Sequence, residues 1–172
     1  LKIMKKILII ISALFIASCA ATPVVVTNSS FDANEVSWFL EEGTGTLKGS
    51  AFLQRRDGML VTCAGNLVSI FPVGTYSSER ISNIYGNLDS GRTTFNIWTS
   101  TRVDEADQQY LIYSKEKKCD VDGKFSFTNL AAGSYFVVSK VEWSVSDYSN
   151  EGGYLMKRVL VNDDEISEIV MN

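Results

Sequence analysis

The stretch Asp122-Gly123-Lys124-Phe125-Ser126-Phe127, followed by Leu130, Gly133 and Tyr135, decides the fold of this chain. An Asp-Gly pair tolerates the positive φ angles of a tight turn, so residues 122–123 are predicted to turn the chain. Phe125 and Phe127 then point to one face, with Lys124 and Ser126 on the other, as a half-buried strand requires. After a second turn over residues 129–133, the alternation from Tyr135 to Trp143 predicts another strand. Two consecutive strands therefore send aromatic side chains into one core.

Outward from this stretch, short strand-like segments alternate with turn signals. Further strands are predicted at residues 46–54, 59–63 with 66–71, 95–99, 109–115, 154–161 and 166–171. Ala64-Gly65 is predicted to be a bulge within one strand, and residues 162–164 to turn a closing hairpin. One short helix is predicted over residues 77–85, capped by Ser77 or Ser78 and ended by Gly86. The fold class is therefore all-β, an antiparallel β-sandwich of about seven strands with one short helix.

The quoted stretch resembles the carboxypeptidase regulatory-like domain, a transthyretin-like (prealbumin-like) Greek-key sandwich related to the Cna B repeats of surface proteins. The family pattern is filled by Asp122, Gly123, Phe125, Phe127, Leu130, Gly133 and Tyr135. The resemblance implies that the phenylalanines enter the core, that Gly133 turns the chain and that Tyr135 braces the corner. Residues 45–72 are similar to the opening strands of bacterial envelope members, so the domain is expected to span residues 43–172. Such sandwiches serve many purposes, and the resemblance implies a fold rather than a function.

Residues 1–18 have the pattern of a secretory leader. Met4-Lys5-Lys6 supplies positive charge, and the apolar run 7–17 is shorter than the roughly 20 residues of a membrane-spanning helix. Ile16-Ala17-Ser18-Cys19 resembles the lipobox of bacterial lipoproteins, which implies cleavage before Cys19 and acylation of that residue. An ordinary cleaved signal peptide with an incidental cysteine is the alternative. Because Ala20 is not aspartate, the resemblance implies an outer-membrane lipoprotein that faces the periplasm or the cell surface.

Residues 19–42 are predicted to be the lipidated tether that joins this anchor to the domain. Small and polar residues dominate the segment, apart from the short β-prone run Val24-Val25-Val26. Trp38-Phe39-Leu40 interrupts the pattern because it is apolar. We expect these three residues to pack onto the domain, with an early strand as the alternative.

Charge and composition exclude several classes of function. The 172 residues contain 16 basic and 20 acidic residues and no histidine, and loss of residues 1–18 leaves 13 basic against 20 acidic residues, a net charge of −7. A negative surface repels phosphate backbones, so nucleic acid is not an expected partner. Without imidazole there is neither Ser-His-Asp or Cys-His chemistry nor a His-ligated zinc. We expect no catalytic activity, no cofactor and no metal.

The three cysteines fit an exported protein. With Cys19 lipidated, Cys63 and Cys119 remain as an even pair in an oxidising compartment, where a disulfide is expected. The alternative is two unpaired buried thiols.

The sequence favours a membrane-anchored, non-catalytic envelope lipoprotein whose sandwich is a structural or protein-binding module. Its partner would be an envelope protein or the cell wall. The rival is a carbohydrate-binding module that uses tryptophans, although alternation places Trp143 in the core and leaves Trp38 and Trp98 undecided. An enzyme that uses Asp104, Glu105 and Asp107 is disfavoured, because nothing in the sequence places two of these carboxylates around a pocket.

Overall fold

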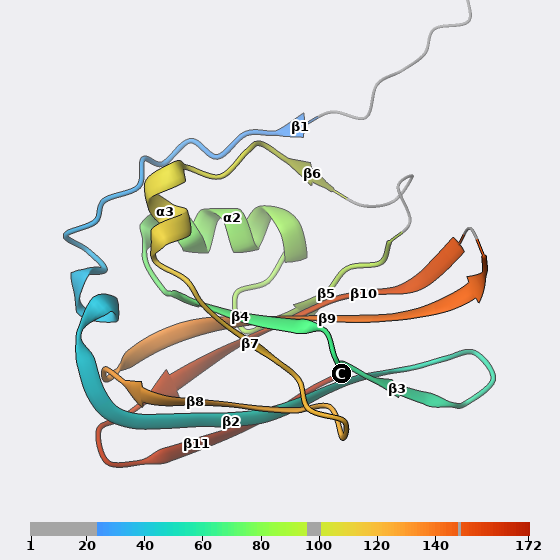
Figure 1. Cartoon of the computed structure of the whole chain (residues 1–172). Coiled ribbons are helices and arrows are strands. Elements are labelled where there is room, and N and C mark those ends of the chain that lie inside the picture. Colours follow the sequence, from blue (N-terminus) through green and yellow to red (C-terminus); the bar gives the residue numbers. More distant parts are fainter. Residues whose placement is uncertain (1–23, 96–100, 148) are drawn as a thin grey trace, which may run out of the picture.

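Two β-sheets enclose the core of the protein, and helices cover the outer face of one of them (Figure 1). The computed structural model describes residues 24–95, 101–147 and 149–172. The elements in chain order are β1 (Val24–Val25), the 3-10 helix η2 (Ser37–Leu40), β2 (Glu42–Gln54), β3 (Leu60–Thr62), β4 (Leu67–Pro72), α2 (Thr75–Tyr85), β5 (Ser90–Arg92), β6 (Arg102–Val103), α3 (Gln108–Ile112), β7 (Lys115–Lys118), β8 (Lys124–Leu130), β9 (Gly133–Ser146), β10 (Ser149–Val161) and β11 (Ile166–Met171). The prediction of an all-β sandwich is confirmed.

The two sheets differ in how their strands are paired. One has five antiparallel strands in the order β5-β10-β9-β4-β7. The other is built around the long strand β2, with β11 parallel to one of its edges and β8 and β3 antiparallel to the other. Ala51 marks the change from β8 to β3, because its N–H donates to Gly123 and its carbonyl accepts from Cys63. A short pair, β1 with β6, lies apart from both sheets.

Two predicted connections are wrong. Ala64-Gly65 is not a bulge within one strand, because β3 belongs to the β2 sheet and β4 to the five-stranded sheet. Residues 162–164 do not turn a hairpin, because β11 leaves β10 and pairs in parallel with β2. In each case the apolar alternation of the two segments is what a hairpin would also show, so the pattern cannot identify the sheet that a strand joins.

The segment predicted as a strand at residues 109–115 is mostly helical. It forms α3, since the Asp107 carboxylate accepts the N–H of Gln109 (2.7 Å) and caps the first turn. Only β7, from Lys115, is a strand. The predicted strand at residues 95–99 lies mostly outside the described residues, and β5 precedes it in the chain.

Helix α2 begins two residues before its predicted start. Its N-cap is Gly74 rather than Ser77 or Ser78, and the Ser77 hydroxyl accepts the Gly74 N–H (2.9 Å) from inside the first turn. Gly86 ends the helix at φ 68°, as predicted. The helix lies on the five-stranded sheet, where Ile81 packs with Phe136 and Met156. Strand β9 is therefore buried on both faces, with Tyr135 on one and Phe136 on the other.

The stretch that decides the fold forms the corner between the sheets. Phe125 and Phe127 of β8 are buried in the core as expected, and their rings meet edge to face. The Tyr135 hydroxyl donates to the carbonyl of Ala131 (2.6 Å) across the β8–β9 connection. Burial raises the pKa of Tyr135, so its hydroxyl stays protonated as a donor. Gly133 has no space for a side chain because the Trp38 ring covers it.

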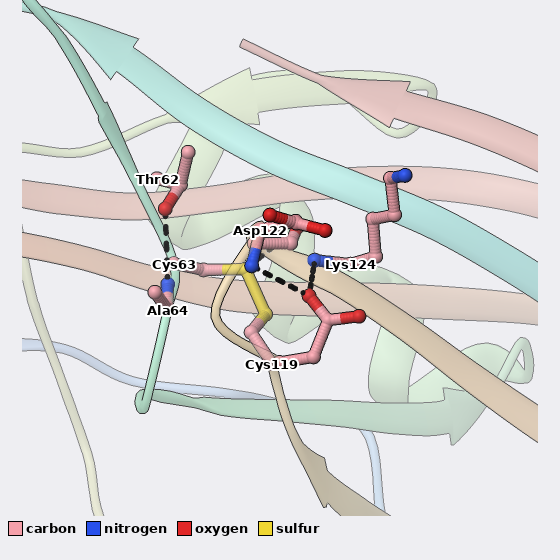
Figure 2. Close-up of a disulfide and its surroundings, with 8 residues drawn as sticks. Thr62, Cys63, Ala64, Cys119, Asp122 and Lys124 are labelled. Atoms are coloured by element: carbon pink, nitrogen blue, oxygen red, sulfur yellow. Dashed lines mark hydrogen bonds between the residues drawn. A yellow bond between two sulfur atoms is a disulfide. The ribbon is translucent and has the colours of Figure 1, made fainter.

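A disulfide joins two of the crossings between the sheets (Figure 2). Cys63 lies between β3 and β4, and Cys119 lies between β7 and β8, with Cα atoms 5.8 Å apart. The predicted bond is thus confirmed. Next to it, the Asp120 carboxylate accepts the N–H groups of Asp122 (2.9 Å) and Lys124 (2.8 Å), which fixes the turn that starts β8.

The predicted tether is packed against the domain over much of its length. Val36 and Phe39 are buried, and Trp38 packs against Tyr135 with the two rings 5.2 Å apart. The expected packing of residues 38–40 therefore holds for Trp38 and Phe39, whereas Leu40 is exposed. The boundary predicted at residue 43 is too late, because apolar residues before it belong to the core.

The start of this packed segment is held by a carboxylate of helix α2. Glu79 accepts the backbone N–H groups of Asn28 and Ser29 (both 2.8 Å) and the Ser29 hydroxyl (2.5 Å). These hydrogen bonds, first that of the Asn28 N–H, lower the pKa of Glu79 to about 2. The carboxylate therefore stays charged in the folded protein well below its ordinary pKa of 4.5.

We expect this attachment to weaken in acid. A folded-state pKa below the unfolded value means that the stabilisation is complete above pH 4.5 and is lost as the pH falls towards 2. Hydrogen exchange of the Asn28 and Ser29 amides should accelerate, relative to core amides, over that range. Glu79→Gln should show fast exchange at every pH, and Glu105→Gln, an exposed control, should behave as the parent. Protection of both amides that is unchanged between pH 6 and pH 2.5 would contradict the assignment.

Candidate functional site

A cleft of about 670 Å³ opens where the β2–β3 hairpin faces the far ends of β9 and β10, on the right of Figure 1. We call it the end cleft. Three segments and one strand residue line it: Leu53, Gln54, Arg55 and Arg56 from the end of β2, Arg92, Thr93, Thr94 and Phe95 from β5 and beyond, Ser149, Asn150, Glu151 and Gly152 from β10, and Trp143 from β9. All of these segments are strand ends or turns, which a rigid sandwich holds in place.

Trp143 forms the apolar wall of the end cleft. It lies on the core-facing side of β9, in line with Tyr135 and Val141, but close to the end of the strand. One side of the indole consequently packs against the core while the residue also lines the cleft. Its Nε1 atom is shielded from solvent and has no hydrogen-bond partner among the described residues. Trp143 therefore packs against the core, as the sequence predicts, and also lines the cleft.

The backbone beside Trp143 comes unusually close to its neighbouring strand. Glu151 pairs with Trp143, and at the next position Gly152 has a φ of 130°. A side chain at Gly152 would collide with the carbonyl of Val141. Glycine is therefore required where β10 passes the wall of the cleft.

The polar lining of the end cleft carries more positive than negative charge. Arg55 is paired with Asp57 at 3.0 Å. Arg56 and Arg92 are exposed, and neither has a carboxylate within 4 Å in the described part of the chain. Glu151 is the one carboxylate among the described lining residues. Guanidinium groups without a partner leave several N–H donors available to a ligand.

This combination suits binding of a hydroxyl-rich ligand. The side of an indole offers an apolar surface for ring C–H groups, and the Gln54 and Asn150 amides and the arginines offer hydrogen bonds. The Asn150 carbonyl oxygen already accepts from Ser144 (2.9 Å), which orients the amide. These groups could therefore bind and orient such a ligand.

The carboxylates considered for an enzyme are not gathered around a pocket. Asp104 pairs with Arg80 (3.2 Å) and accepts from Thr27, Asp107 caps α3, and Glu105 is exposed. Trp38 packs inside the corner of the sandwich rather than at a cleft. Cys19 and Trp98 lie outside the described residues. None of the helices that the structure describes is long and apolar enough to cross a membrane.

The end cleft was not predicted from the sequence. Its arginines come from a turn and a short strand that are far apart in the chain and belong to different sheets, so they become neighbours only when the two sheets pack together. A turn rich in arginine at residues 55–58 was the one available signal. It indicates a turn but not a site.

Together, the fold and cleft define a β-sandwich with a polar, aromatic-lined recess at one end. No protein-family model matches the chain, and no curated protein matches its sequence. The fold is similar to the crystal structure of a proposed carbohydrate-binding protein from Pseudomonas aeruginosa, with a TM-score of 0.70 and 20% sequence identity. The match covers 83% of this chain and 97% of the other. At this identity the likeness shows the fold alone, and the resemblance to carboxypeptidase regulatory-like domains stays a prediction.

Proposed function

We propose that this chain is a non-catalytic, lipid-anchored envelope protein that binds carbohydrate in the end cleft. The observation that carries the proposal is the placing of Trp143 beside the unpaired Arg56 and Arg92 in one recess. The proposed carbohydrate-binding protein with a similar fold supports it as an analogy. Binding of an envelope protein, which the sequence also favours, stays a prediction.

In this proposal the end cleft binds the ligand and the lipid anchor attaches the domain to the membrane. A sugar ring would lie against Trp143, while the arginines and the two amides would donate to its hydroxyl oxygens. Acylation of Cys19, which rests on the lipobox resemblance, would hold the domain at the membrane. A single acyl chain binds membranes only marginally, so the several chains of a bacterial lipoprotein would be needed.

Binding to glycans should quench or shift the fluorescence of Trp143. With the Cys19→Ser form of the protein and a panel of soluble glycans, including peptidoglycan fragments, we expect at least one ligand to change the emission. Trp143→Phe should abolish that change, whereas Trp38→Phe should keep it, because Trp38 lies in the corner against Tyr135. Arg92→Ala should weaken the affinity about tenfold through the loss of charge-assisted hydrogen bonds. A panel without any response, or an equal loss in the control Arg158→Ala, would refute the cleft as the binding site.

A further inference from the structure

A second hollow, of about 800 Å³, lies on the outer face of the β2 sheet, the side of the sandwich away from the helices (Figure 1). We call it the lysine groove. Its lining is Lys48, Gly49 and Ser50 of β2, Lys117, Lys118 and Asp120 at the end of β7, Lys124, Phe125 and Ser126 of β8, and Glu168, Ile169 and Val170 of β11. It shares no residue with the end cleft.

Strand register produces the groove. Lys124 is aligned with Ser50 and, across β2, with Val170, while Ser126 is aligned with Lys48 and Glu168. Because the intervening residues of β2 and β8 enter the core, these side chains must point outward. Figure 2 shows the Lys124 side chain extending away from the disulfide. Lys117 and Lys118 come from the edge of the other sheet, which the short turn around Asp120 joins to the start of β8.

Among the residues that the structure describes, the four lysines of the groove have no ion-pair partner. The ion pairs within the described residues are Arg55–Asp57, Arg80–Asp104 and Lys140–Glu142, all of them elsewhere. Asp120, which lines the groove, is already occupied by two backbone N–H groups. Four of the seven lysines between residues 24 and 172 thus share one surface with two carboxylates, Asp120 and Glu168, so positive charges outnumber negative ones by four to two.

Such a concentration is unexpected in a chain whose net charge is −7 without its leader. Neighbouring ammonium groups repel one another, and a hollow with an excess of one sign of charge attracts an oppositely charged ligand. The four lysines come from three separate segments of the chain, which the fold brings together. The groove crosses β8, β2 and β11, which suits an extended ligand with repeated negative charges better than a single small anion.

We propose that the lysine groove binds an anionic polysaccharide, one that carries carboxylate, phosphate or sulfate groups along its chain. This rests partly on the proposed anchoring at Cys19. Val24 lies on the helix side of the molecule, and the five residues from Cys19 to Val24 span at most about 18 Å. The helix side is then nearest the membrane and the groove faces away from it. A polymer beyond the membrane is accordingly a better fit than the lipid headgroups.

The proposal is tested with polygalacturonate as the anionic polymer and dextran as the neutral one, using the Cys19→Ser protein. We expect binding to polygalacturonate that weakens as the salt concentration rises, and none to dextran. The variant Lys48→Gln with Lys124→Gln should bind about tenfold more weakly, since two of four attracting charges are removed. The matched control, Arg102→Gln with Arg158→Gln, makes the same change of charge at exposed residues outside the groove and should bind as the parent does.

The outcomes separate this proposal from the one on the end cleft. Trp143→Phe should leave polygalacturonate binding unchanged, because Trp143 does not line the lysine groove. If this variant loses only the binding of the soluble glycans, the result bears on the end cleft and not on the groove. No binding to polygalacturonate, or equal weakening in the groove variant and its control, would overturn the proposal. Tighter binding to vesicles of phosphatidylglycerol than to polygalacturonate would also overturn it, in favour of a membrane-facing role. Thermal unfolding of both double variants should match the parent, because all four side chains are exposed.

Discussion

Replacing Cys63 and Cys119 by alanine is expected to lower the free energy of unfolding by about 4 kcal/mol. The bond closes a loop with a sequence separation of 56 residues. Its loss raises the conformational entropy of the unfolded chain and so favours unfolding. Folded-state packing adds to the effect, because both cysteines are buried between the sheets. Denaturation by urea, followed by tryptophan fluorescence, measures the change.

A double-mutant cycle separates the bond from the two side chains. Cys63→Ala and Cys119→Ala should each cost nearly as much as the double variant, because either one breaks the same bond. A reducing agent should destabilise the parent and leave all three variants unchanged. The control is Cys19→Ser, which removes the third cysteine and should not alter unfolding of the domain. Coincident curves for the oxidised and reduced parent would show that the disulfide does not stabilise the fold.

Local pattern predicted most of the long strands but not their partners. Alternation and turn signals are properties of neighbouring residues, so the sequence alone predicts that Phe125, Phe127 and Tyr135 lie on buried faces. Whether residues 166–171 turn back on β10 or cross to β2 depends on which sheet has a free edge, and this is decided by contacts far apart in the chain. The one parallel pair of the sandwich, β2 with β11, was missed for this reason.

Neither candidate site could be predicted from the sequence, for a related reason. The sequence gives the net charge of the chain, which is negative, but not where the charges lie on the folded surface. The position of each charge depends on the fold: strand register brings Lys48 and Lys124 to one face, and the packing of the two sheets places Arg56 near Arg92. A chain that is acidic overall can therefore present two positively charged recesses. The helical cover of β9 was also not predicted: Phe136, on the face of β9 opposite Tyr135, packs against Ile81 of α2.

Phe39→Ala is expected to lower the free energy of unfolding by about 3–5 kcal/mol. Phe39 has an exposed fraction of 0% and packs against the rings of Trp38 and Tyr135, with the Lys115 ammonium 5.0 Å from the centre of its ring. Truncation would open a cavity in the corner that Tyr135 braces. The same transition in urea measures the loss.

The neighbouring residue provides the control for this prediction. Leu40 has an exposed fraction of 54%, so Leu40→Ala should change the free energy of unfolding by no more than about 0.5 kcal/mol. A flexible tether would make both substitutions neutral, and equal midpoints for the two variants would restore the predicted boundary at residue 43. A large difference between them means that the folded body starts well before that residue. The linker between a lipidated Cys19 and the folded domain would then be short, and this would restrict the orientation of the anchored domain at the membrane surface.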